Sequence, residues 1–299
     1  DSDEHMAAGT YDKLYYINPS LTVTDITPSS GFTSGSLNGA LNLGYGGGFM
    51  GSTNYGRAPT SSGVYAEATT WSLDTWGEYL LGVSSTDGKL LEWQGNPSAN
   101  AAVVANAPVD NLAMVVTEER FVFCLGAGGN PRKVAWSDKE NNTLWSAAAT
   151  NEAGDMELQT NGQIMCGVRM RGATLILTSE DAHLATYSGA PFVYGFQRVG
   201  TACGIASRKA AVAIDEGAFW MGKKGFYTFN GSTATEIACE VADYVFDDLN
   251  PSQVSKVYAV HNSQFGEIWW FYPSASANEN DRYVTLDYKE GHWATGVID

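Results

Sequence analysis

RKAAVAIDEGAFWMGKKGFYTFNGSTATEIA, residues 208–238, contains four short runs of apolar and aromatic residues separated by turn residues. The turns fall at Glu216-Gly217, at Lys223-Lys224-Gly225 and at Asn230-Gly231, where glycine allows a tight reversal of the chain. Short runs of this kind, bounded by glycine, are typical of antiparallel strands joined by hairpins. This stretch therefore predicts a four-stranded antiparallel sheet.

Five further clusters of strand-like runs accompany this one. They extend from Met6 to about Thr27, from about Glu67 to Asn106, from about Asn111 to Asn161, from Ile164 to about Ile205, and from Val254 to the end. Six clusters in 299 residues repeat at about 50 residues, or about 43 without one long loop, which is the period of propeller blades. The sequence thus predicts an all-β fold, a single β-propeller domain of about six blades over residues 1–299. A pair of β-sandwiches is the runner-up, although its strands would be less evenly spaced.

Two segments depart from the strand pattern. Residues 29–66 are rich in Gly, Ser, Thr and Asn and predict a long projecting loop after the first blade, which is either an interface or a bare surface loop. In residues 239–249 the apolar Val241, Tyr244, Val245 and Leu249 recur at helical spacing and predict a short amphipathic helix.

The third cluster is divided into strands at 111–117, 120–126, 132–138 and 143–148. These are NLAMVVT, RFVFCLG, RKVAWSD and TLWSAA, and AGDMELQTNG at 153–162 is predicted as an extended tail.

Composition limits the classes of function. The 17 Lys and Arg against 33 Asp and Glu give a formal charge of −16, which argues against a DNA-coating surface, because phosphate binding needs clustered cations. The four cysteines lie far apart, which predicts buried free thiols rather than a zinc knuckle or a disulfide framework. No apolar run is long enough to cross a bilayer, so membrane insertion is not expected. Because the chain does not begin with Met, we expect it to be part of a longer protein.

A search for reactive groups predicts no catalytic, cofactor-binding or metal-ligating residues. The four histidines, His5, His183, His261 and His292, are dispersed and lack ligand spacing. The acidic groups at 180–181, 247–248 and 279–281 lie at apparent turns, where carboxylates ordinarily cap backbone N–H groups. GYGGGFMG at 44–51 lacks the Lys-Ser/Thr of a phosphate loop and is assigned to flexible loop.

One segment is more specific, Trp136-Ser137-Asp138 followed by a polar stretch and Trp145. It partly resembles the Asp-box hairpin of sialidase propellers, but the central glycine is missing. With Arg132-Lys133-Val134-Ala135 before it, the segment resembles more closely a signature of the tail hub and nozzle proteins of short-tailed bacteriophages. Further blocks resemble that family in order and spacing, namely AGTYDKLY (8–15), DITP (25–28), AGDMEL (153–158), GAPFVY (189–194) and GFYTFNG (225–231).

This resemblance implies a structural virion protein without enzymatic activity, made in the host cytoplasm and assembled into the viral tail. It implies a ring of six copies that contacts the portal adaptor and the fibres or needle, and through which DNA passes during ejection without specific binding. The alternative function is a glycan-binding or glycan-hydrolysing propeller that contacts sugar through exposed aromatic residues such as Trp269, Trp270 or Trp293.

Overall fold

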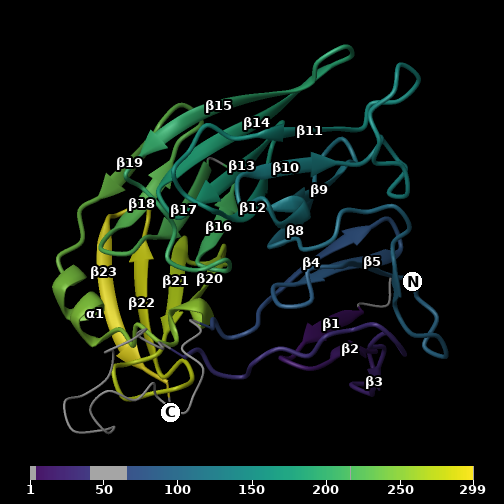
Figure 1. Cartoon of the computed structure of the whole chain (residues 1–299). Helices are drawn as coiled ribbons and strands as arrows, with labels where there is room; N and C mark the ends of the chain where they lie inside the picture. Colours follow the sequence, from purple (N-terminus) through teal and green to yellow (C-terminus); the bar gives the residue numbers. More distant parts are fainter. Residues whose placement is uncertain (1–4, 41–65, 216, 299) are drawn as a thin grey trace, which may run out of the picture.

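The chain forms a six-bladed β-propeller with one short α-helix in the described part. The computed structural model describes residues 5–40, 66–215 and 217–298. Figure 1 shows the six sheets arranged around a central axis, from the first blade (purple) to the sixth (yellow). The fold class and the number of blades predicted from the sequence are confirmed.

Each blade is an antiparallel sheet made from consecutive strands. The first blade has three strands and each of the others has four. The strands are β1 (Met6–Gly9), β2 (Leu14–Ile17) and β3 (Val23–Asp25); β4 (Trp71–Trp76), β5 (Tyr79–Ser84), β6 (Leu90–Trp93) and β7 (Ala102–Val103); β8 (Ala113–Val116), β9 (Val122–Leu125), β10 (Lys133–Trp136) and β11 (Gly154–Glu157); β12 (Ile164–Met170), β13 (Ala173–Thr178), β14 (Asp181–Gly189) and β15 (Val193–Thr201); β16 (Ala211–Ile214), β17 (Gly217–Met221), β18 (Phe226–Phe229) and β19 (Ala234–Ile237); β20 (Tyr258–Asn262), β21 (Glu267–Tyr272), β22 (Arg282–Asp287) and β23 (His292–Val297).

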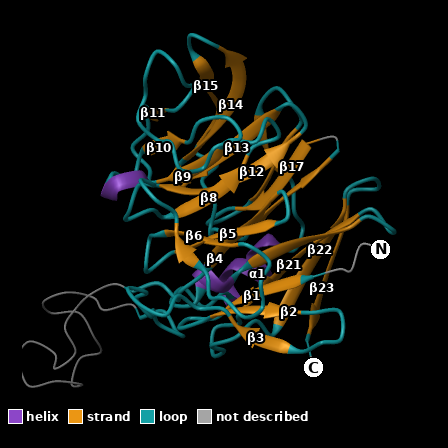
Figure 2. Ribbon diagram, turned by 90° about the vertical axis from the view of Figure 1, so that its right-hand side faces the viewer, coloured by secondary structure: helices purple, strands orange, loops and turns teal. Residues whose placement is uncertain are grey.

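The first strand of each blade lies nearest the axis. Contacts join β4 to β8, β8 to β12, β12 to β16 and β16 to β20, so these strands form the inner wall of the ring. The side view in Figure 2 shows the blades stacked beside one another as twisted sheets.

Apolar side chains fill the spaces between most neighbouring blades. In blade 6 the strand β21 alternates, with Ile268, Trp270 and Tyr272 buried and the intervening residues half-exposed. Trp270 packs on Phe226 of blade 5 with ring centroids 4.9 Å apart, and its indole N–H donates to the Ala210 carbonyl at 3.1 Å. One apolar cluster thereby joins blades 4, 5 and 6, and others join blades 3 and 4, blades 2 and 3, and blades 1 and 2.

The join between blade 6 and blade 1 is different. In the described part, no apolar cluster spans these two blades. The segment that leads from blade 1 to blade 2 instead hydrogen-bonds the loop before blade 6. The Gly39 N–H donates to Gln253 Oε1 and Gln253 Nε2 donates to the Gly39 carbonyl, both at 3.0 Å. Lys256 Nζ also donates to Asn38 Oδ1 at 2.9 Å.

Several local predictions are confirmed or corrected. The helix α1 (Ala242–Asp248) lies within the predicted 239–249 segment, and two 3-10 turns, η1 (Ala127–Gly129) and η2 (Val254–Lys256), were not predicted. Residues 143–148 were wrongly predicted as a strand; the fourth strand of blade 3 is β11, within the predicted tail. In residues 143–148, Trp145 Nε1 donates to the Asn142 carbonyl at 2.7 Å, which fits a turn rather than a ladder.

The prediction of a long loop at 29–66 falls mostly on residues 41–65, which lie outside the described residues, as does GYGGGFMG. Residues 29–40 are irregular apart from a bridge between Ala40 and Ala66. Among the described helices, none has the length and apolar character needed to cross a bilayer.

Candidate ligand site in the central channel

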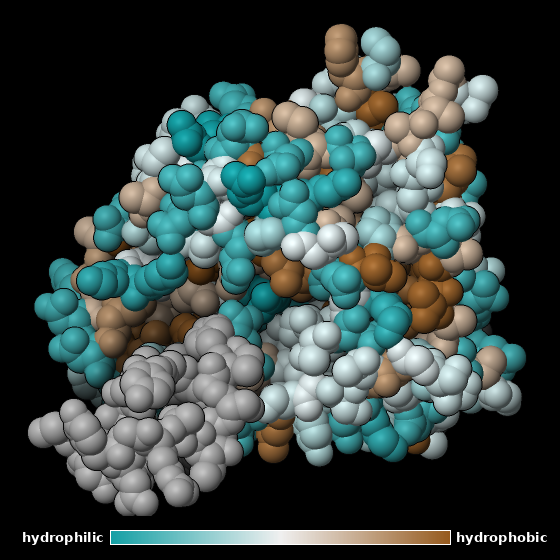
Figure 3. Space-filling model, viewed as in Figure 1, coloured by the Kyte–Doolittle hydropathy of each residue, from teal (hydrophilic) through white to brown (hydrophobic). Residues whose placement is uncertain are grey.

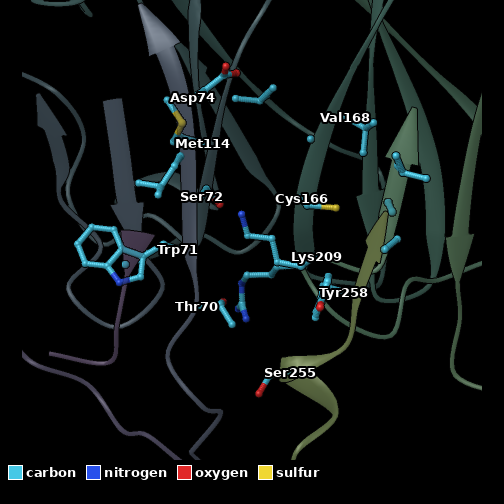
Figure 4. Close-up of a pocket in the computed structure, with 18 of the residues that line it drawn as sticks. Thr70, Trp71, Ser72, Asp74, Met114, Cys166, Val168, Lys209, Ser255 and Tyr258 are labelled. Carbon is cyan, nitrogen blue, oxygen red and sulfur yellow. The ribbon is translucent and has the colours of Figure 1, made fainter. Parts of the chain in front are cut away.

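A cavity of about 880 Å³ lies on the axis of the propeller, and all six blades line it. The lining residues are Gly9 from blade 1, 69–74 from blade 2, Met114 and Val115 from blade 3, 166–169 from blade 4, 208–209 and 211–213 from blade 5, and 255–256 and 258–259 from blade 6. Figure 4 shows these side chains converging on the channel from the surrounding strands.

Three cations lie at one end of the channel, where the inner strands begin. Arg208 and Lys209 immediately precede β16, and Lys256 precedes β20. Arg208 forms an ion pair with Glu67, and Lys256 forms one with Glu279. Two of the three charges are therefore balanced by carboxylates.

Arg208 is buried and paired with a carboxylate. Its side chain is only 6% exposed, and NH1 is occupied by Glu67. The buried Nε–H has no hydrogen-bond partner among the described residues. Because this atom is shielded from the channel, a ligand there would not reach it, and the open cation at this end is Lys209.

Lys209 extends into the middle of the channel (Figure 4). No hydrogen bond or ion pair to its ammonium is present among the described residues. Water reaches the side chain along the channel, yet protein surrounds it, and this partial desolvation lowers the pKa of Lys209 below its ordinary value. The negative charges of the Cys166 thiolate and the Asp74 carboxylate act in the opposite direction and raise the pKa of Lys209. Because Lys209 is exposed to the channel and has no carboxylate partner among the described residues, an incoming anion can reach its ammonium and pair with it.

The remaining wall near the cations is polar or aromatic. Thr69, Thr70, Ser72 and Ser255 supply hydroxyl groups, and Tyr258, which is 40% exposed, supplies an aromatic ring. Cys166 also lines the channel, but burial raises the pKa of its thiol to about 12, so it is a poor nucleophile.

The far end of the channel carries both signs of charge. Asp74 lies 3.6 Å from Arg169, and a second hollow of about 450 Å³ there is lined by Glu118, Arg171, Asp215 and His261 among others. The two ends of the channel therefore differ: the far end combines Arg169 and Arg171 with several carboxylates, whereas Lys209 has no carboxylate partner among the described residues.

The chemistry available at that end is anion binding and proton transfer. A lysine with a lowered pKa can bind a carboxylate when charged and act as a base when neutral. In the described part of the chain, no group of three or more His, Cys, Asp or Glu side chains is placed to hold a metal ion.

The structure disperses the histidines. His5 Nδ1 lies 2.7 Å from the Tyr16 hydroxyl, and His183 is buried 3.2 Å from Asp181. His261 lies 3.2 Å from the Tyr288 hydroxyl, and His292 is on the surface near Glu290. The acidic turn residues do bond nearby groups, as when Asp281 accepts from the Ser274 N–H at 2.7 Å.

The three tryptophans named for the glycan-binding alternative differ in burial. Trp270 is fully buried, and Trp293 packs on Phe226 with ring centroids 4.7 Å apart. Trp269 points to the opposite face of the sheet and is half-exposed. Trp293 is half-exposed as well, so only Trp270 of the three is removed as a candidate for ligand contact. Arg208, Lys209 and Tyr258 were missed, because nothing in the sequence near them shows that they line a channel.

The blocks that resemble phage tail proteins lie on blades 1, 3, 4 and 5. The GAPFVY block forms the tip of the hairpin between β14 and β15, which projects beyond the ring at the top of Figure 1. Phe192 at this tip is 81% exposed. Figure 3 shows a largely hydrophilic surface on which apolar residues are scattered, including some on projecting parts.

Comparisons with known proteins support the fold. No family model matches the chain, and no curated protein matches it. Among solved structures, virginiamycin B lyase from Staphylococcus aureus matches 100% of this chain and 82% of its own with a TM-score of 0.59 and 6% identity. A streptogramin B lyase matches 76% of this chain and 68% of its own with a TM-score of 0.52 and 7% identity. Dihydro-heme d1 dehydrogenase NirN matches 99% of this chain and 53% of its own with a TM-score of 0.53 and 11% identity.

These matches correct one prediction. The chain was expected to have no enzymatic activity, but the three solved structures above, which share its fold over most of its length, are two lyases and a dehydrogenase. At such low identity they show the propeller fold alone, and catalytic residues are not carried over from them.

Proposed function

We propose that this protein binds an acidic glycan in its central channel. The observation that carries the proposal is Lys209, a channel cation without a carboxylate partner among the described residues. Beside it in the sequence, Arg208 also lines the channel, but its charge is paired with Glu67. A chain of net charge −16 repels anions in general, so a cation kept unpaired at the centre favours one specific anionic ligand.

The lining of the channel supports a carbohydrate as the carrier of that anion. Hydroxyl groups of Ser72 and Ser255 can exchange hydrogen bonds with sugar hydroxyls, and the Tyr258 ring can pack on the apolar face of a sugar. The carboxylate of a uronic acid would then lie against the ammonium of Lys209.

Binding of a uronic-acid disaccharide, measured by calorimetry, tests the proposal. The neutral disaccharide with the same linkage serves as the control ligand. We expect the acidic ligand to bind more tightly, and Lys209→Met to weaken its binding by at least about ten-fold, which corresponds to one charge-assisted hydrogen bond. The affinity should also fall with added salt.

Lys224→Met is the matched control variant, because Lys224 is an exposed lysine of the same blade and does not line the channel. It should leave the affinity unchanged. The proposal is overturned if neither disaccharide binds at millimolar concentration, or if Lys209→Met binds the acidic ligand as tightly as the native chain. The same samples, followed for new reducing ends or unsaturated products, would show turnover.

A role in the tail of a short-tailed phage is the second candidate. It is supported by the sequence blocks and by the projecting hairpin between β14 and β15. The aromatic ring of Phe192 is exposed at the tip of this hairpin. An exposed aromatic at the end of a long hairpin suits contact with another protein chain. In this second candidate function, six copies form a ring through which DNA passes. The ring contacts the portal adaptor and the fibres or needle. A tail component that binds an acidic glycan would meet that glycan on the host surface.

Light scattering of the purified chain tests the ring. The second candidate predicts a mass of six copies at micromolar concentration and a smaller species for Phe192→Ser. If the native chain stays monomeric even at millimolar concentration, the proposal of a six-copy ring is wrong.

A further inference from the structure

The last strand of blade 4 has a long open edge. β15 is the terminal strand of its sheet, so its outer edge has no strand partner among the described residues. In the described part it has nine residues, whereas the last strands of the other blades are shorter: β3, β7, β11 and β19 have two to four residues and β23 has six. An unpaired edge of this length is a template on which another strand can pair.

The first half of β15 extends beyond the inner strands of its blade. β13 pairs with β14 only as far as Ala185, whereas β14 and β15 continue to pair beyond that point, with Thr186 opposite Gly195. These residues belong to the hairpin that projects at the top of Figure 1. Blade 5 lies close to β15 at Gly200, near the other end of the strand. The edge at residues 193–197 is therefore open to another chain.

Aromatic packing against blade 3 holds this hairpin in place. The ring centroids of Tyr187 and Tyr194 lie 5.5 Å and 5.3 Å from that of Phe121 in blade 3. The Tyr194 hydroxyl also forms a buried hydrogen bond of 3.0 Å with the Thr117 hydroxyl. A two-stranded ribbon is marginally stable by itself, so these contacts keep the edge extended in the absence of a partner. Less conformational entropy is then lost when a partner binds.

The projecting hairpin carries no charge. From Thr186 to Gln197 the sequence is TYSGAPFVYGFQ, whereas the whole chain has a formal charge of −16. Two copies of such a chain repel one another, and they do so least where neither presents a charge. By contrast, β11 carries Asp155 and Glu157, and β19 carries Glu236. Charged side chains commonly protect sheet edges from pairing, and the start of β15 lacks this protection.

We infer that two copies of this chain associate by antiparallel pairing of their β15 edges at residues 193–197. A two-fold axis brings each edge opposite the same edge of the second copy, so both edges gain identical partners. The exposed ring of Phe192, directly before the strand, then lies against the second copy. The inference goes beyond the proposed functions. Because a two-fold contact closes at two copies, it does not by itself build a ring of six.

Sedimentation equilibrium of the purified chain from micromolar to millimolar concentration tests the inference. We expect a monomer–dimer equilibrium with a dissociation constant of about 100 µM, because one short strand pair buries less surface than a stable interface. Gly195→Lys should weaken dimerisation by at least about ten-fold, since the added charges meet across the two-fold axis. A side chain fits at this position within one copy, because a Cβ atom at Gly195 would have its nearest contact at 3.6 Å, with the Ser188 hydroxyl.

Ser232→Lys is the matched control variant. It adds the same charge at an exposed turn between β18 and β19 of blade 5, and it should dimerise as the native chain does. Hydrogen exchange supplies a second measurement. In the native chain the amides of residues 193–197 should exchange more slowly at high than at low protein concentration, and this dependence should disappear in Gly195→Lys.

The inference is overturned if the native chain stays monomeric at millimolar concentration, or if Gly195→Lys dimerises as tightly as the native chain. It is also overturned if residues 193–197 exchange at one rate at all concentrations. A mass of six copies that Gly195→Lys retains would support the ring and contradict the two-fold contact. These results leave the binding of acidic disaccharides in the channel to its own test. A circular dichroism spectrum of each variant establishes that it has folded.

Discussion

The two joins of blade 6 to its neighbours are built differently. Toward blade 5, Trp270 and Phe226 pack in a fully buried aromatic cluster. Toward blade 1, hydrogen bonds such as those between Gly39 and Gln253 link the chain segments, and the sheet face itself keeps half-exposed rings. The same sheet thus uses one face for stability and leaves the other accessible. An apolar interface excludes ligands, whereas a polar join beside an exposed face leaves room for them.

The first way to test this comparison is to truncate neighbouring tryptophans on the two faces of β21. Trp270→Ala removes a fully buried side chain, and we expect a loss of about 3 to 5 kcal/mol in the free energy of unfolding. Trp269→Ala removes a half-exposed side chain and should cost about 1 kcal/mol. Urea denaturation measures both. Equal losses would mean that both faces are packed.

The second test concerns the polar join. Gln253 is 3% exposed, and Gln253→Ala deletes both hydrogen bonds to Gly39. We expect a loss of about 1 to 3 kcal/mol, because buried backbone groups lose their partners. Gln197→Ala, at an exposed glutamine of β15, is the control and should be neutral. A Gln253→Ala chain as stable as the control would show that these bonds do not hold the join.

The smallest expected effect is a change of stability with pH that is caused by Lys209. This residue lies in the channel beside Tyr258 of blade 6. Its pKa is lowered in the folded state by desolvation, so the unfolded chain binds the proton more tightly. The charged lysine therefore destabilises the fold below its folded-state pKa, and the penalty is relieved as the pH rises toward 10.5, the value for an unperturbed lysine. Relative to Lys209→Met, the native chain should gain stability over that rise. Denaturation curves of both chains from neutral to alkaline pH measure the difference, and parallel curves would contradict a desolvated lysine.

The blades were predictable because each is built from consecutive strands. Turns such as Asn230-Gly231 and the alternation of apolar residues are local signals, so the cluster from Arg208 to Ala238 matches β16 to β19 closely. The strand error at 143–148 arose because Leu144 and Trp145, two large apolar residues outside any strand, resembled a strand, whereas the polar Asp155 and Glu157 obscured the strand pattern of β11.

The channel site was not predictable in this way. Lys209 and Tyr258 are adjacent only because blades 5 and 6 place them across a parallel bridge. The sequence also could not tell which of Trp269 and Trp270 faces outward, because adjacent strand residues point to opposite faces and the register of the sheet against its neighbour decides between them.

The polar join has a consequence for the order of folding. Gly39 and Gln253 are 214 positions apart, whereas the strands within each blade are connected by short segments. Bringing distant positions together costs chain entropy that grows with their separation, and contacts of this kind slow folding. The blades are therefore expected to form and stack in sequence, with the ring closing last. Until blade 6 is complete, Gly39 has no partner in Gln253, so the channel comes into being only at the final step of folding.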